Sequence, residues 1–222
     1  MSSSDQRITR SADGTDLAGS FAAPCGLPPW LLDRRSVAVK RLGPPAPSAE
    51  EQQLILSAAL TAPDHNALRP WRLVLCEADF RPHLADLFVA AKRALNPAAS
   101  DLELEREREK AERPPLLVAL IAAPKGGLTR VPEAEQIASA GAALQSILLA
   151  SQALGYGAII LSGSRCKAAA VQAALGVAAG EYLLGFISIG SIVDTPRLAS
   201  RPKLEDVMLR LGAAGIVRAV EP

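Results

Sequence analysis

Alternating strand and helix signals predict, on their own, a layered α/β domain. Three observations support this expectation. Apolar runs of strand length alternate with longer stretches of helical periodicity. Apolar residues fill 49% of the 222 positions and aromatics only 4%, which indicates an aliphatic core of substantial size. No linker-like stretch divides the chain, so we expect a flexible polar leader over residues 1–26 and one domain over residues 27–222.

The first elements are short and carry clear capping signals. Pro28-Pro29 opens a short helix that runs to Asp33 and delivers Arg34-Arg35-Ser36. After a proline-rich turn, Ser48 is a predicted N-cap, and Glu51 three residues later completes a capping box. The helix that follows is expected to end near residues 62–63, and its apolar stripe consists of Leu54, Ile55, Ala58 and Ala59.

The middle of the chain predicts two strands and two helices. Trp71–Glu77 is a strand, and a helix follows over about residues 79–94. Residues 101–113 form a charge run at helical spacing, with predicted pairs between Glu109 and Arg113 and between Glu105 and Arg108. We expect this helix face to be solvated and without function. Two prolines end the helix, and residues 116–123 form a continuous apolar strand.

A long helix over residues 133–154 has no polar face. Its positions are apolar or small nearly all the way round, so we expect a second subunit to provide part of its cover. Residues 137–164 carry no charge, a length that could span a bilayer. Gln145, Gln152 and the Gly155-Tyr156-Gly157 break favour a buried helix followed by a strand over residues 158–161 instead. A helix over residues 167–175 and a last central strand over residues 182–189 complete the pattern.

Composition excludes several classes of function. The formal charge of +1 lacks the basic surplus that nucleic-acid binding requires. Three cysteines without a CxxC pair predict reduced thiols in a cytoplasmic protein, and the polar N-terminus predicts no signal peptide. Only His65 and His83 are present, which excludes a multi-histidine metal centre. The chain contains no phosphate-binding GxxxxGK[ST] loop, no complete GxGxxG and no GxSxG elbow.

Four short segments remain as candidates for chemistry. They are Arg34-Arg35-Ser36, residues 62–72 at a helix-to-strand junction, residues 155–159 leading to Ser162-Gly163, and residues 201–207. Two guanidinium groups and a hydroxyl after a helix suit a phosphate and a polyol chain, because arginine binds phosphate in a fork geometry. The alternative is an arginine pair on the surface.

In this order, the Arg-Arg-Ser, Ala-Pro-Asp-His and Pro-Trp motifs resemble the nitroreductase family, in particular its compact subgroup with an Ala-Pro-Asp-His motif. The resemblance runs from about Leu31 to Val207. It implies an α+β fold, a dimeric three-layer sandwich whose helices flank a mixed, mostly antiparallel sheet, and this replaces the parallel expectation. It also implies FMN as cofactor, NAD(P)H as co-substrate, a small organic acceptor such as a nitroaromatic or quinone, and a homodimer with active sites shared across the interface.

The resemblance also implies roles for particular residues. Arg34, Arg35 and Ser36 would contact the phosphate and ribityl chain of FMN, and Arg201 would complete the phosphate site. His65, with Thr61 one turn earlier, would reach the flavin of the partner subunit. The loop that lines the isoalloxazine ring would consist of Ile160, Leu161, Ser162 and Gly163. The alternatives are a helix-capping His65, a Thr61 on a helix surface, and a Trp71 that belongs to the core. No side chain is expected to act as nucleophile or general base, because the cofactor carries the chemistry.

Two departures from the family pattern bear on the acceptor. Compact members often carry Trp-Arg where this chain has Ile160-Leu161, and the wider family often has Asn and Gln where Leu68-Arg69 precede Pro-Trp. We hypothesise that Arg69 supplies the positive charge that Leu161 lacks; the alternative is a solvated arginine beside a proline. Rival functions are a specialised dehydrogenase or flavin-fragmenting enzyme on the same scaffold, and a flavin-binding protein without turnover.

Overall fold

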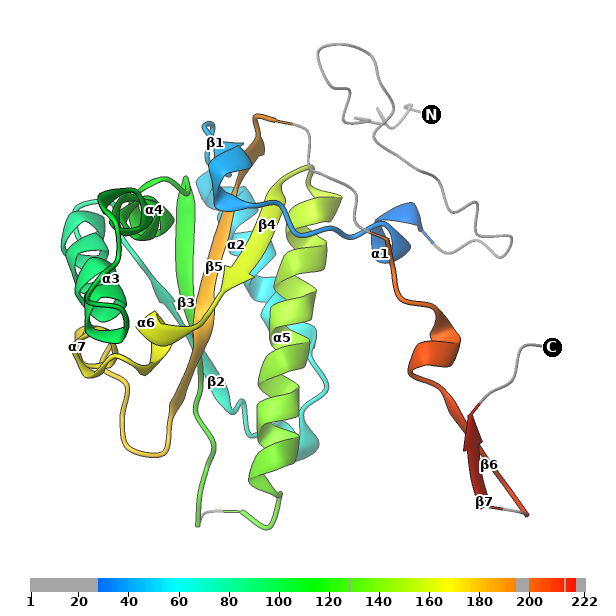
Figure 1. Cartoon of the computed structure of the whole chain (residues 1–222). Helices are drawn as coiled ribbons and strands as arrows, with labels where there is room; N and C mark the ends of the chain where they lie inside the picture. Colours follow the sequence, from blue (N-terminus) through cyan, green and yellow to red (C-terminus); the bar gives the residue numbers. More distant parts are fainter. Residues whose placement is uncertain (1–27, 128, 195–199, 214, 219–222) are drawn as a thin grey trace.

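The computed structural model describes residues 28–127, 129–194, 200–213 and 215–218, so the expected leader lies outside the described residues. The body is built on one five-stranded sheet (Figure 1). Strand β5 (Tyr182–Ile192) lies between β3 (Leu116–Ala122) and β4 (Gly157–Leu161), and β1 (Leu42–Gly43) pairs with the C-terminal end of β5. Strand β2 (Trp71–Leu75) pairs with β3 and forms the far edge.

Every strand pairing in this sheet is antiparallel. The layered parallel arrangement expected from periodicity alone is therefore wrong, and the α+β class is confirmed. Parallel pairing among the described residues is limited to one isolated bridge, between Ser36 and Ala158. Strand β3 is buried at all seven positions, because helices cover both faces of the sheet. Such a strand shows no alternation, so its sequence cannot indicate its direction.

Helices enclose the sheet on both faces and give three layers (Figure 1). Helices α3 (Arg81–Leu95) and α4 (Asp101–Glu112) cover one face, and α2 (Ala49–Ser57) and α5 (Glu133–Ala153) cover the other. Alternate residues of β3 serve the two layers: Leu117 packs into a cluster with Leu84 and Phe88, whereas Leu116 packs with Ile55 and Ile147. The sandwich thus has two aliphatic cores that share one sheet.

Helix α5 is covered on only one side within a single chain. Its buried stripe contains Ala140, Ala143, Ile147 and Ser151. Ala138, Gly141 and Gln145 are exposed on the other side. The expectation that this helix is covered on every side is therefore not met by the chain alone, which leaves an uncharged helix face open in the described structure.

Local capping signals predicted the helix starts well. The capping box of Ser48 and Glu51 is present at the start of α2, which continues as a 3₁₀ turn, η2 (Ala58–Thr61). Other short elements of the first half are α1 (Pro29–Leu32), η1 (Val39–Arg41) and η3 (His65–Ala67). The single helix expected over residues 167–175 is instead divided into α6 (Ser164–Lys167) and α7 (Ala169–Ala174).

The charged helix α4 is not simply a solvated face. The Glu109–Arg113 pair is present at 3.8 Å, but Arg108 pairs with Asp86 and Glu112 rather than with Glu105. Glu107 is buried, together with Leu104 and Ala111. The expectation of a solvated face is therefore wrong for this side of the helix, because α4 packs against α3.

The C-terminal part contains elements that the sequence did not predict. After η4 (Leu204–Asp206), strands β6 (Leu209–Gly212) and β7 (Gly215–Arg218) form a hairpin that extends away from the body (Figure 1). Its large apolar side chains are strongly exposed, including Leu209, Leu211 and Ile216. None of the helices in the described ranges is both long and apolar enough to cross a bilayer.

The close approach of β4 and β5 depends on Gly185. A Cβ at this position would lie 2.7 Å from Ile160 Cγ1 and 2.9 Å from the Leu161 carbonyl oxygen. We expect Gly185→Ala to lower the free energy of unfolding by about 1–3 kcal/mol, because the backbone oxygen cannot move without shifting β4. Urea denaturation would measure this. Gly126→Ala is the matched control, since its Cβ would meet nothing within 4 Å; equal stability of the two variants would contradict the packing explanation.

Candidate functional site

Three arginines gather where α1 leads toward the sheet. Arg34 and Arg35 follow α1, and Arg201 approaches from the C-terminal segment. The Arg201 guanidinium donates to the carbonyl oxygen of Arg34 at 2.9 Å and to that of Leu32. Burial, followed by the charges of Arg201 and Arg35, lowers the pKa of Arg34 below its usual value. Three cations are therefore held together despite their repulsion.

This arginine cluster has hydrogen-bond donors without acceptors. Arg34 Nη1 and Arg35 Nε are buried and have no partner among the described residues. No carboxylate of the described residues forms an ion pair with Arg34, Arg35 or Arg201. A buried donor left unsatisfied costs about 1–3 kcal/mol, and more when it is charged. The arrangement therefore suits an oxyanion such as a phosphate, which would satisfy the donors and cancel the repulsion.

The segment that carries the cluster is fixed to the start of β4. Ser36 forms the parallel bridge with Ala158, and the amide of Val37 donates to the Ala158 carbonyl at 3.0 Å. The Arg35 amide donates to Gln152 Oε1 at 3.2 Å, which ties the segment to the last turn of α5. Ser36 is exposed beside the cluster, so its hydroxyl is accessible to the same ligand.

A second group of predicted residues lies at the other end of β4. Ile160 and Leu161 are half-buried at the end of the strand, and Ser162 and Gly163 are exposed beyond it. The backbone of Gly163 has φ 101° and ψ −152°, a conformation open almost only to glycine. From Ala158 to Ser162 the strand advances about 13 Å. One elongated ligand with an anionic end can therefore reach both the arginine cluster and this loop.

A buried ion pair between Arg165 and Glu107 contacts the backbone of that loop, and the sequence analysis did not predict it. Arg165 Nη2 lies 2.6 Å from Glu107 Oε2, and Arg165 Nη1 donates to the Ser162 carbonyl. Burial alone would raise the pKa of Glu107, but hydrogen bonds from Lys110 and Arg165 lower it below its usual value. The signal was present in the spacing of Leu104, Glu107 and Ala111, which share one helix face.

Thr61 and His65 lie elsewhere, along α5. Thr61 Oγ1 donates to the Ala58 carbonyl at 2.8 Å and lies 3.3 Å from Ser146 Oγ. His65 Nδ1 lies 3.0 Å from Glu135 Oε2, and its side chain is 59% exposed. The histidine is therefore paired with α5 and accessible, rather than acting as the side-chain cap of η3.

The predicted site residues therefore do not all meet at one place in the described chain. The arginine segment is bound to Gln152 near the end of α5, whereas His65 is bound to Glu135 in its first turn. These two positions are 17 residues apart, which corresponds to about 26 Å of helix. His65 therefore does not converge with the arginine cluster within the described chain, whereas Thr61, beside Ser146, lies about 9 Å along α5 from Gln152.

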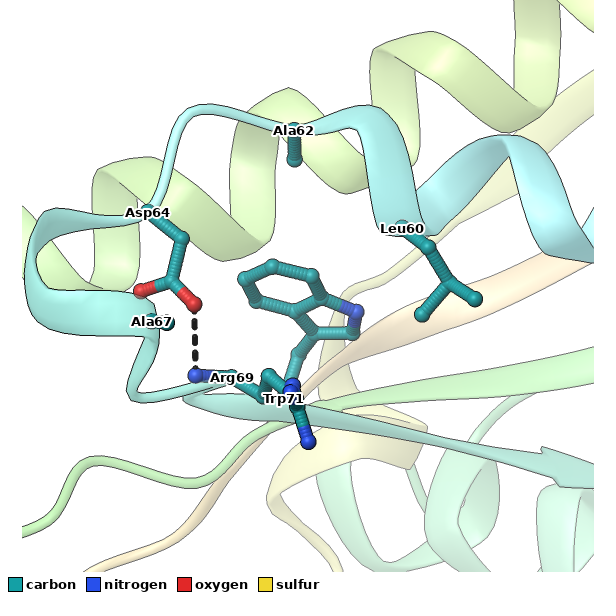
Figure 2. A pocket seen from close by; sticks show the side chains of 6 residues that line it. All are labelled: Leu60, Ala62, Asp64, Ala67, Arg69 and Trp71. Carbon is teal, nitrogen blue, oxygen red and sulfur yellow. Dashed lines mark hydrogen bonds between the residues drawn. The ribbon is translucent and has the colours of Figure 1, made fainter.

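A pocket of about 490 Å³ opens beside the His65 segment (Figure 2). Its lining consists of Leu60, Ala62, Asp64, Ala67, Arg69 and Trp71. The Trp71 indole forms a wall of the pocket and is also packed against the core cluster, as expected of a core residue. Asp64 Oδ2 accepts a hydrogen bond from the Arg69 amide at 2.6 Å. This contact holds a tight loop in which Asn66, Ala67 and Arg69 have positive φ values.

Comparisons with known proteins point to one family. The model of the Nitroreductase family matches residues 31–191. The Escherichia coli protein YdjA, named as an NAD(P)H nitroreductase, is 32% identical over 168 residues, which cover 76% of this chain and 87% of YdjA. A nitroreductase-like protein from Bacillus cereus has a TM-score of 0.65 at 21% identity and covers 81% of this chain and 92% of its own. A Desulfovibrio desulfuricans structure of the nitroreductase type, in complex with FMN, has a TM-score of 0.62 at 24% identity. The match covers 82% of this chain and 94% of the Desulfovibrio chain.

Proposed function

The chain belongs to the nitroreductase family, and from this premise we propose that it is a homodimeric flavin oxidoreductase. It would hold FMN and transfer electrons from NAD(P)H to a small organic acceptor such as a nitroaromatic or a quinone. We place it in the cytoplasm, because its described cysteines, Cys76 and Cys166, are buried and unpaired.

The arginine cluster is the observation that carries this proposal. The unsatisfied donors of Arg34 and Arg35 suit the phosphate of FMN, and Arg201 adds a third cation at the same place. Ser36 would contact the phosphate or the ribityl chain. The loop of Ile160, Leu161, Ser162 and Gly163, about 13 Å along β4, would line the ring.

The side chains are suited to binding rather than to covalent chemistry. When bound, FMN supplies the redox step by accepting a hydride from NAD(P)H and passing two electrons on. Burial raises the pKa of the Cys76 thiol to about 11 and also raises that of Cys166, so neither is a reactive thiolate near neutral pH. The described residues include no group of histidines, cysteines and carboxylates suited to a metal. The protein's part would be to orient the ring and admit two substrates in turn.

A second subunit would complete the site. His65 lies about 26 Å along α5 from the arginine segment, too far along the helix to contact the same end of one ligand, and Thr61 contacts α5 at Ser146, between the two. Both His65 and Thr61 are exposed on the chain's surface, as residues that serve a partner's flavin would be. The open face of α5 and the apolar hairpin of β6 and β7 offer surface for the partner.

Binding of FMN to the arginine cluster gives the direct test. We expect the protein to be yellow, or to become so with added FMN, and Arg34→Ala to weaken FMN binding by about 1–3 kcal/mol. Fluorescence titration would measure the Kd. Arg93→Ala, an exposed arginine on α3, is the control and should bind as the wild type does. An unchanged Kd in Arg34→Ala would remove Arg34 from the site. Oxidation of NADH or NADPH with a quinone present would distinguish an enzyme from a flavin-binding protein without turnover.

A dimer through α5 predicts a position-specific effect of charge. Ala138 is exposed on α5 and Ala170 is exposed on α7. In an isolated chain, glutamate at either position would be tolerated. We expect Ala138→Glu to dissociate the dimer or to lower its melting temperature, because the new charge would be buried at the interface, whereas Ala170→Glu should change neither. Light scattering at micromolar concentration would measure the oligomeric state. A folded wild-type monomer would contradict both the dimer and the shared site.

Arg69 provides a test of the charge-compensation hypothesis. Its side chain borders the Trp71 pocket and forms no ion pair with other described residues. A cation near the flavin ring favours the negatively charged reduced form. Arg69→Met keeps much of the length and removes the charge, so the midpoint potential of bound FMN should fall and reduction by NAD(P)H should slow, with FMN still bound. A potential equal to that of the wild type would leave Arg69 as a surface residue.

A further inference from the structure

The guanidinium of Arg165 is unusually well held. The residue is only 6% exposed. Its Nε and Nη2 both donate to Glu107 Oε2, at 3.3 and 2.6 Å. Its carbon Cζ lies 5.4 Å from the ring centroid of Phe88, within cation–π range. Phe88 in turn packs edge-to-face against Phe186 at 4.8 Å. Residues of α3, α4 and β5 therefore fix one side chain of the four-residue helix α6.

The remaining donor of this guanidinium acts on the candidate ring-binding loop. Arg165 Nη1 donates to the carbonyl oxygen of Ser162, which therefore points toward the buried side chain. In a trans peptide the carbonyl and the next amide N–H point in opposite directions. The Gly163 N–H is accordingly turned away from Arg165, toward the exposed side of the loop. This amide has no acceptor among the described residues, and Gly163 itself is exposed.

Stability alone is a poor explanation for this pair. Removing two charges from water is costly, and a buried ion pair can often be replaced by apolar side chains of similar volume without loss of stability. What an apolar replacement could not do is hold the Ser162 carbonyl. The guanidinium fork links that carbonyl to Glu107 with fixed geometry, because its donors lie in one plane.

We propose that Arg165 and Glu107 are positioning residues of the flavin site, which hold the Ser162–Gly163 peptide so that the Gly163 N–H is presented to a hydrogen-bond acceptor on the bound ring. This inference rests on the proposed function. It assigns a role to two residues that need not touch the flavin, one of them within the charge run of α4.

The chain offers a matched control in Arg72. Its guanidinium also pairs with a glutamate, Glu181, at 2.7 Å and donates to a backbone carbonyl, that of Gly176, at 2.7 Å. It joins β2 to the end of α7 and to the turn before β5, and among the described residues it donates to no carbonyl of the β4 loop. Lysine at either position keeps the charge but loses the planar fork, so the two Arg→Lys variants impose the same chemical change on two similar networks.

The experiment measures FMN affinity, the visible absorption spectrum of bound FMN and the melting temperature for the wild type, Arg165→Lys and Arg72→Lys. We expect both variants to lose some thermal stability. Only Arg165→Lys should raise the Kd for FMN, by roughly two- to ten-fold for one neutral hydrogen bond, and shift the flavin absorption bands. If Arg165→Lys does not fold, Glu107→Gln, which keeps the shape of the side chain, should show the same spectral shift.

The outcomes separate the two proposals. FMN affinity and spectrum equal to those of the wild type in both Arg165→Lys and Glu107→Gln would overturn the positioning role and leave the proposed function intact. An equal change in Arg72→Lys would also overturn it, since the effect would then follow from general loss of stability. A wild type that binds no FMN would overturn the proposed function, and the inference with it.

Discussion

The pairing of β5 with its neighbours is the constraint on which the rest of the structure depends. The middle of β5 is buried, and β5 is the strand against which β3, β4 and β1 all align. The position of β4 on β5 determines where the arginine segment can attach, since Ser36 and Val37 bond to Ala158. It also determines where the Ser162–Gly163 loop emerges. Both ends of the candidate ligand site are therefore set by the register of one strand on another.

Local chemistry in the sequence predicted the positions of the main helices and strands of the body. Ser48 and Glu51 specify a helix start by themselves, because the capping box needs only residues close in sequence. Strand direction could not be predicted in the same way. β3 is apolar at every position, so it fits a parallel or an antiparallel neighbour equally well, and the family resemblance rather than periodicity indicated the antiparallel sheet.

The candidate site shows a similar division. Arg201 lies more than 160 positions from Arg34 and Arg35 in sequence, yet their residue types suited one phosphate and the structure brings them together. The burial of Glu107 could not be predicted from the charge run around it, because its partner Arg165 lies on an element distant in sequence. The hairpin of β6 and β7 was also missed. Its apolar side chains do not pack on the body, so no core-directed pattern identified it.

If the unsatisfied arginine cluster binds the proposed anion, the abundance of the folded protein would depend on the supply of that anion. Repulsion among the three guanidinium groups opposes folding, and an oxyanion bound there would offset it; a ligand present at 100 times its Kd adds about 2.7 kcal/mol to the stability of a folded state. Chains that remain unfolded are removed by cellular proteases. With FMN as that anion, a cell short of riboflavin would contain fewer molecules of this protein, and those molecules would be less active. The degradation rate of the protein would then depend on the riboflavin supply.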